Sequence, residues 1–287
     1  MLSNSQLFLL ALVLSIFNWL MTFLGSSLVY FVKSKSQKLV SIALGLAAGI
    51  MIAATFFSLL LPAIQQVEDH LLLLFLIPLV FFSGGLFLRL CDKFLPHEHI
   101  ISHQKEGPTN TLSKNKLLLL AMTLHNIPEG LAVGIAIASV KTNLVPALIL
   151  SIGIGIQNFP EGTAISLPLH ESGISRFKAM MYGQYSALVE IPSALLGFLF
   201  AQLFSSILPF ALSFAAGAMM FVCIEELIPE ANALKEVDVG TMSFMVGFMI
   251  MMSLQALMVL DLKRVPSLSP GSRMMFISSM CSICCPS

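Results

Sequence analysis

This chain has 287 residues, of which 57% are hydrophobic and only 10% are charged, whereas about a quarter of the residues of a soluble domain carry charge. Its 15 basic and 15 acidic residues balance, so the composition points to neither nucleic acid nor an acidic partner. With a mean hydropathy of +0.91, the chain is predicted to be an all-α, polytopic protein of the lipid bilayer.

Eight segments are long and apolar enough to cross a membrane as helices of about 20 residues. The first has no basic residue before it and is too long for a signal-peptide core, so we expect it to remain as a span. Together the spans define one membrane domain, 1–264, with a polar loop at 92–116 and a tail of unknown role at 265–287. The expected spans are 7–32, 39–64, 71–91, 117–139, 144–169, 179–204, 207–229 and 240–262.

The distribution of Lys and Arg sets the expected orientation, because cytoplasmic loops carry an excess of both. With the N-terminus outside, eleven of the 15 basic residues fall on the cytoplasmic side and four on the outer side. Both termini are therefore predicted to lie outside a cell membrane, either plasma or inner. No Lys or Arg lies deep within a span, whereas several Glu do, so the spans do not favour the passage of anions.

Two spans share a sequence pattern. The segments 44–64, in the second span, and 212–231, in the seventh, both contain Ala-Ala-Gly-x-Met and both reach a proline further on, Pro62 and Pro229. In an eight-span chain these two run in opposite directions, which is the pattern of an inverted repeat, as found in many secondary transporters. Chance similarity between two apolar helices is the alternative. The repeat would leave the fourth and fifth spans in the middle.

Those two middle spans carry a paired polar motif, HNIPEG in the fourth and QNFPEG in the fifth. Residues four apart share a face of a helix, so His125 stacks with Glu129 and Gln157 with Glu161. A carboxylate at the centre of a membrane helix costs about 2.5–3.5 kcal/mol on insertion scales. Both glutamates are therefore candidate functional groups.

Each motif also contains a proline, Pro128 and Pro160, which lacks an N–H and so frees a backbone carbonyl one turn earlier. Freed carbonyls at membrane depth must be satisfied by some other group. Asn126 and Asn158 each lie three residues before the glutamate of their motif. Because a short turn joins the two spans, both motifs can face each other near mid-membrane. A bound divalent cation would explain this convergence, and proline kinks with glycine packing are the alternative.

Several other residues have two interpretations each. Glu190, in the sixth span, either completes the cluster or pairs with a Tyr or Ser in a packed core. Met51, in the second span, offers a soft thioether that helps select transition metals, although a methionine there is more often core packing. Glu225, Glu226 and Glu230, near the cytoplasmic end of the seventh span, form either an exit station for cations or a solvated helix end.

The loop between the third and fourth spans contains His97, Glu98, His99 and His103. These residues could trap metal that leaves the pore, and a solvated polar loop is the competing interpretation. The chain's five cysteines do not form a disulfide framework. Cys223 lies within a span and Cys91 at a helix end, where both are expected to pack as small apolar residues. The other three, in the tail, make only a weak zinc site. 

The paired motif in an eight-span chain resembles the ZIP family of divalent metal transporters. The similarity extends over spans two to eight, through AAGIMIAA, VEIP and EELIPE, and the stretch GIGIQNFPEG is most similar to the GufA-like branch. The resemblance implies a 3+2+3 arrangement in which spans one to three are related to spans six to eight. It also implies import toward the cytoplasm by an elevator-like movement of one bundle against the other, often in a homodimer.

The resemblance further implies a two-metal centre between the fourth and fifth spans. Its second site would use Asn126 and Asn158, with Glu129 and Glu161 as bridging ligands. Some binuclear relatives have Asp where this chain has Asn158, and a neutral amide should make the second site weaker or only transiently filled. The ligands implied for the first site are Met51, His125, Glu129, Gln157, Glu161 and Glu190.

We therefore expect a non-enzymatic importer of Zn²⁺, with Fe²⁺, Mn²⁺ and Cd²⁺ as further candidate substrates. One alternative is an intramembrane zinc-dependent hydrolase, which would want an open coordination position and typically an H-E-x-x-H motif that this sequence lacks. The other alternative is a sensor that binds metal without moving it. A flux measurement separates the transporter from both.

Overall fold

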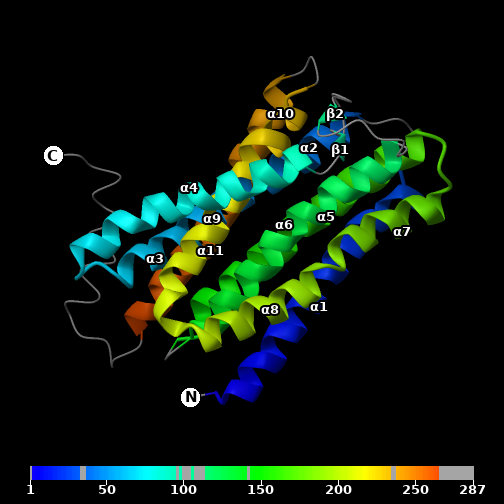
Figure 1. The fold of residues 1–287 in the computed structure, drawn as a ribbon. Coiled ribbons are helices and arrows are strands. Elements are labelled where there is room, and N and C mark those ends of the chain that lie inside the picture. Colours follow the sequence, from blue (N-terminus) through cyan, green and yellow to red (C-terminus); the bar gives the residue numbers. More distant parts are fainter. Residues whose placement is uncertain are drawn as a thin grey trace.

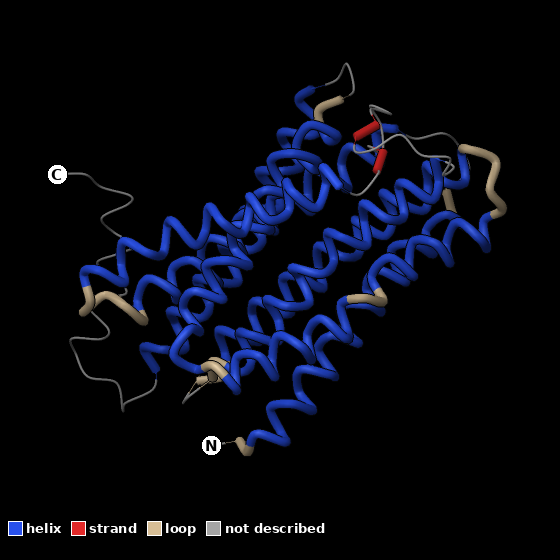
Figure 2. Tube along the Cα trace, viewed as in Figure 1, coloured by secondary structure: helices blue, strands red, loops and turns tan. Residues whose placement is uncertain are grey.

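The computed structural model describes residues 2–32, 37–94, 97–98, 105–106, 114–140, 143–233 and 237–264. Helices make up most of these residues, as Figure 2 shows. The described strands are two residues long each, β1 (His97–Glu98) and β2 (Lys105–Glu106), and they pair antiparallel. The predicted all-α, polytopic membrane fold is confirmed.

Each of the eight predicted spans is a helix or a run of consecutive helical segments. Among the described residues, six of these rods are long and apolar enough to cross a membrane, and the other two, α5 and α6, carry the paired polar motifs. In chain order the rods are α1 (Asn4–Ser27); α2 (Gln37–Ala54) with α3 (Leu61–Gln65); α4 (Leu71–Phe94); α5 (Lys114–Ala138); α6 (Val145–Glu171); α7 (Arg176–Ala187) with α8 (Glu190–Leu203); α9 (Leu208–Val222) with α10 (Ile228–Ala231); and α11 (Val237–Arg264).

The sixth span differs from the single helix that the sequence predicts. Helix α7 ends at Ala187 and α8 begins at Glu190. The cause is Pro192, which has no N–H to donate to the carbonyl of Leu188. The break places Glu190 in the first turn of a helix. Helices α5 and α6, by contrast, continue through the prolines of their motifs.

The rods pack as two bundles. Helix α1 packs along α6 and α5 along α8 in the first bundle (α1, α5, α6, α7 and α8), whereas α2 packs along α11 and α4 along α9 in the second (α2, α3, α4, α9, α10 and α11). The bundles meet where α2 contacts α6 and where α5 contacts α9. Figure 1 shows α5 and α6 in the middle, between α1, α7 and α8 on one side and α4, α9 and α11 on the other.

Packing within the second bundle follows the repeat. Gly49 of α2 and Gly217 of α9 occupy the same place in Ala-Ala-Gly-x-Met, and each lies against the backbone of a partner helix. A Cβ at Gly49 would collide with the carbonyl of Phe244 in α11, and a Cβ at Gly217 with the carbonyl of Phe81 in α4. Small residues allow membrane helices to approach this closely.

Both repeat segments also contain a π-helical turn before their proline. It covers Thr55–Leu60 between α2 and α3, and Cys223–Leu227 between α9 and α10. Such turns insert an extra residue into a helix and are frequent at functional sites. The repeat expected from the sequence therefore has a counterpart in both backbone geometry and packing.

Only part of the predicted loop 92–116 can be compared with the structure. His97 and Glu98 form β1, where His97 pairs with Glu106 and Glu98 with Lys105. His99 and His103 lie outside the described residues, and so does the predicted tail 265–287. The interpretation of this loop as a metal trap stays a prediction.

Adjacent glycines in α4 test how tightly α4 and α9 pack. A Cβ at Gly84 would collide with the backbone carbonyl of Phe214, whereas the nearest atom to a Cβ at Gly85 is 3.4 Å away. We expect Gly84→Ala to lower the free energy of unfolding by about 1–3 kcal/mol, the usual cost of overpacking. Gly85→Ala should have little effect or stabilise the helix. Thermal unfolding in detergent, followed by Trp19 fluorescence, measures both, and equal stabilities would contradict the packing argument.

Candidate metal site

The polar residues of both motifs are buried. These residues and Glu190 are each at most 4% exposed, and among residues whose exposure the structure describes no Lys or Arg is buried. Burying several carboxylates without a compensating charge is costly. The cluster therefore consists of His125, Asn126, Glu129, Gln157, Asn158, Glu161 and Glu190.

Amide groups hold two of the carboxylates. Gln157 Nε2 donates to Glu129 Oε1 at 2.5 Å and joins α6 to α5, and Asn158 Nδ2 donates to Glu190 Oε1 at 2.7 Å and joins α6 to α8. Glu129 also interacts electrostatically with Glu161 and Glu190. The structure thus brings Glu190 to the two motifs, and carboxylates from three helices form one cluster.

Seven buried oxygen atoms of the cluster have no hydrogen-bond partner in the described part of the chain. All are carboxylate or amide carbonyl oxygens and therefore accept hydrogen bonds. Buried polar atoms are normally paired, and leaving them unpaired costs free energy. A cation would satisfy several of them at once. The atoms are Asn126 Oδ1, Glu129 Oε2, Gln157 Oε1, Asn158 Oδ1, Glu161 Oε1 and Oε2, and Glu190 Oε2.

His125 connects the cluster to the second bundle. Its Nε2 lies 2.7 Å from Glu226 Oε1, in the π-helical turn that follows α9. Glu226 and Glu230 are 6% and 3% exposed, whereas Glu225 is exposed. The solvated helix end proposed for these three acids therefore describes Glu225 only, and Glu226 contacts the buried cluster through His125.

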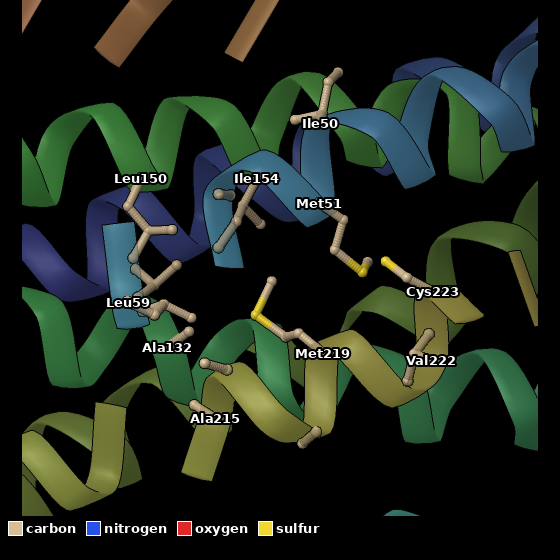
Figure 3. Close-up of a cluster of buried hydrophobic side chains, with 14 of the residues drawn as sticks. Ile50, Met51, Leu59, Ala132, Leu150, Ile154, Ala215, Met219, Val222 and Cys223 are labelled. Atoms are coloured by element: carbon tan, nitrogen blue, oxygen red, sulfur yellow. The ribbon is translucent and has the colours of Figure 1, made fainter. Parts of the chain in front are cut away.

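Met51 and Asn126, two further predicted ligands, are also buried. Met51 is 1% exposed and points into the core between α2 and α9 (Figure 3). Asn126 Nδ2 donates to the carbonyl of Met122 in its own helix at 2.7 Å. Within the described residues, no three His, Cys, Asp or Glu side chains are close enough to hold a metal ion together. Hydrogen bonds link Glu129 to Gln157 and Glu190 to Asn158, so an ion would have to replace these amide contacts and the contact of His125 with Glu226.

Sequence analysis overlooks Asn18, a buried polar residue beside the cluster. Asn18 is fully buried in α1, and its carbonyl accepts from Asn158 Nδ2 at 3.4 Å. The side-chain amide of Asn18 can be placed in two orientations. In the one that gives both its oxygen and its nitrogen suitable partners, Asn18 Nδ2 donates to the carbonyl of Ser151 at 2.9 Å. The sequence does contain an indication of Asn18, because a lone polar side chain inside an apolar span is unusual, as Glu129 is in its own span.

Known proteins are similar to this chain over most of its length. The family model of the ZIP zinc transporter matches residues 103–255. The chain is 37% identical to the zinc transporter GufA of Myxococcus xanthus, over 77% of this chain and 88% of GufA. It is 32% identical to the zinc transporter ZIP11 of Xenopus tropicalis, over 84% of this chain and 94% of ZIP11. It is also 32% identical to the zinc transporter ZIPB of Bordetella bronchiseptica, over 81% and 76% of the two chains. The resemblance indicated by the paired motif is confirmed, and the chain belongs to the ZIP family.

Proposed function

We propose that this integral membrane protein imports Zn²⁺ toward the cytoplasm through the buried cluster of α5, α6 and α8. The observation that carries the proposal is the set of seven buried acceptor oxygens without partners, in a region with no buried Lys or Arg among the described side chains. GufA, ZIP11 and ZIPB are all named zinc transporters, which supports transport rather than hydrolysis.

The cluster matches the coordination chemistry of zinc. Carboxylate oxygens and neutral imidazole are common zinc ligands, and the amide oxygens of Gln157 and Asn158 can add to them. The proposed first site uses Glu129 and Glu161 as its central ligands and the proposed second site shares them. The complete proposed ligand set is Met51, His125, Asn126, Glu129, Gln157, Asn158, Glu161 and Glu190.

A pocket between the bundles suggests where the ion arrives. Both bundles line it, with Gln66 near α3, Asn143 before α6 and Gln255 in α11 among its polar residues. Ala136 also lines the pocket and lies seven residues from Glu129 along α5, about 10 Å at 1.5 Å per residue. His125 and Glu226 lie on the far side of Glu129, so pocket, carboxylates and His125 follow one another along α5.

Glycine contacts support an elevator-like movement of the two bundles. Among the described glycines, each one whose Cβ would collide with the backbone of another rod lies against a helix of its own bundle, as Gly25 does against Phe159 and Gly134 against Ala194. Backbone contact locks helices together, whereas side-chain contact between bundles permits sliding. We propose that the first bundle carries the ion and that Glu226 and Glu230 receive it on release.

The proposal includes the orientation of the protein in the membrane, its assembly and the other ions that it carries. The distribution of Lys and Arg supports both termini lying outside a cell membrane. We also propose that the protein forms a homodimer. Fe²⁺, Mn²⁺ and Cd²⁺ are proposed as further substrates, because carboxylate and imidazole ligands bind all three ions.

Removal of either central carboxylate tests the transport site. We expect Glu129→Ala and Glu161→Ala to abolish saturable Zn²⁺ uptake into proteoliposomes, because each change removes a ligand shared by both proposed sites. A zinc-sensitive dye inside the vesicles measures uptake, and Glu68→Ala, in the exposed turn after α3, serves as the control. If the wild-type protein binds Zn²⁺ but no Zn²⁺ reaches the dye, the proposal that the protein transports Zn²⁺ is wrong. A sensor or a hydrolase then becomes the better interpretation.

Uptake should fall as the medium becomes acidic. Carboxylates and imidazole bind metal only when deprotonated, so protons compete with Zn²⁺ for the site. At subsaturating Zn²⁺ we expect the initial rate to decrease steadily from about pH 7 to about pH 5, because histidine titrates in this range. The measurement uses the same vesicles with a pH-insensitive reporter. A flat profile would rule out binding limited by these ligands.

Asn158 allows a test of the proposed second site. Its amide oxygen offers no negative charge, so Asn158→Asp should strengthen that site and allow a second Zn²⁺ to bind per chain. Elemental analysis of the purified protein after equilibration with Zn²⁺ gives the stoichiometry. Asn143→Asp, at the pocket, adds the same charge elsewhere and should leave the stoichiometry unchanged. An identical metal content in all three proteins would argue against a second site at Asn158.

A further inference from the structure

Sulfur-bearing side chains gather on the second bundle's side of the interface. Met51 of α2, Met219 of α9 and Cys223 at the start of the second π-helical turn are each at most 1% exposed. Figure 3 shows the sulfur of Met51 and the thiol of Cys223 pointing toward each other, while Met219 reaches into the same core. These three side chains form an apolar part of the second bundle at its interface with the first.

The repeat relates these positions to one another. Met51 and Met219 are the methionines of the two Ala-Ala-Gly-x-Met segments, and Cys223 follows Met219 by four residues, as Thr55 follows Met51. Thr55 and Cys223 are also the first residues of their π-helical turns. Both present a polar atom inside the core, and the buried hydroxyl of Thr55 has no hydrogen-bond partner among the described residues. In the second repeat the equivalent place is taken by a soft sulfur.

Cys223 lies close to groups of the proposed ligand set. Its Sγ is 4.0 Å from the carbonyl oxygen of Ala48, one helical turn before Met51, and its sulfur points toward that of Met51. Three residues after Cys223, in the same π-helical turn, Glu226 Oε1 lies 2.7 Å from His125 Nε2 of the first bundle. Cys223 therefore lies beside one proposed ligand and in the turn that contacts another.

We propose that Cys223 is a further metal ligand on the transport path and that, with Met51, it favours thiophilic Zn²⁺ and Cd²⁺ over Mn²⁺. The inference rests on the proposed function, since it concerns the same path. Thiolate and thioether are soft ligands, whereas Mn²⁺ prefers carboxylate, carbonyl and water. The cysteine binds as its thiolate, and its proton is released on binding.

The two sets of ligands belong to different bundles. Glu129 and Glu161 are in the first bundle, whereas Met51 and Cys223 are in the second. Within the described ranges these groups do not form a finished coordination shell. Cys223 therefore meets the ion in the part of the cycle in which the bundles bring sulfur and carboxylate together, and it acts on selectivity at that step.

Cadmium spectroscopy tests the bond directly. A cadmium–thiolate bond gives an ultraviolet charge-transfer band that oxygen and nitrogen ligands do not produce. The protein is the full chain with every cysteine except Cys223 changed to Ser, and the matched control also carries Cys223→Ser. On addition of Cd²⁺ we expect the band in the first protein only. Its absence from the first protein would overturn the inference whether or not metal is transported.

Selective transport gives a second readout. In vesicles, Cys223→Ser should raise the half-saturating concentration of Cd²⁺ at least about tenfold more than that of Mn²⁺, since even outer-shell changes cost 10–100-fold in metal affinity. Cys91→Ser, in α4, should leave the ratio unchanged. Cys223→Ala keeps a small apolar residue and should reproduce the Ser result if folding is intact. An unchanged ratio in both Cys223 variants overturns the inference, whereas no uptake by the wild type overturns the proposed function.

Discussion

Buried negative charge without buried positive charge is the constraint around which this molecule is arranged. Glu129, Glu161 and Glu190 come from three helices, and no cationic Lys or Arg is buried beside them among the described side chains. The amides of Gln157 and Asn158 each satisfy one carboxylate oxygen and leave another without a partner. An amide suits this role because it orients a carboxylate without neutralising it, whereas a buried Lys would occupy the site with its own charge.

The same constraint is met within one bundle. The carboxylates and amides belong to α5, α6 and α8, whose glycines bring the helix backbones into contact, so one rigid bundle holds the cluster. At the interface, His125 of α5 reaches Glu226 beyond α9, and the sulfur atoms of Met51 and Cys223 point toward each other. An ion bound at the proposed site would contact groups from both bundles, and its passage would depend on how the bundles are positioned.

Sequence alone predicts the spans and the members of the cluster, because apolar length and intramembrane polar residues are direct signals. It does not predict how those members pair. Residues four apart suggest that His125 stacks with Glu129, yet His125 contacts Glu226 and Glu129 contacts Gln157 of the next helix. The periodicity of apolar residues likewise does not predict the π-helical turns. Partners across helices depend on packing that joins residues far apart in the chain, such as His125 and Glu226, which are separated by 101 positions.

The exchange of partners between the repeats has a consequence for biosynthesis. Helix α2 finds its partner in α11, α4 in α9, and α1 in α6, so each early helix packs on one made much later. No bundle is complete when half of the chain has been inserted. The glycine face of α2 stays exposed to lipid or to the insertion machinery until the last helix emerges. A chain that stops before α11 would contain seven of the eight membrane rods, but the surface of α2 that packs on α11 would remain uncovered. Cellular quality control could recognise such a chain by this uncovered surface.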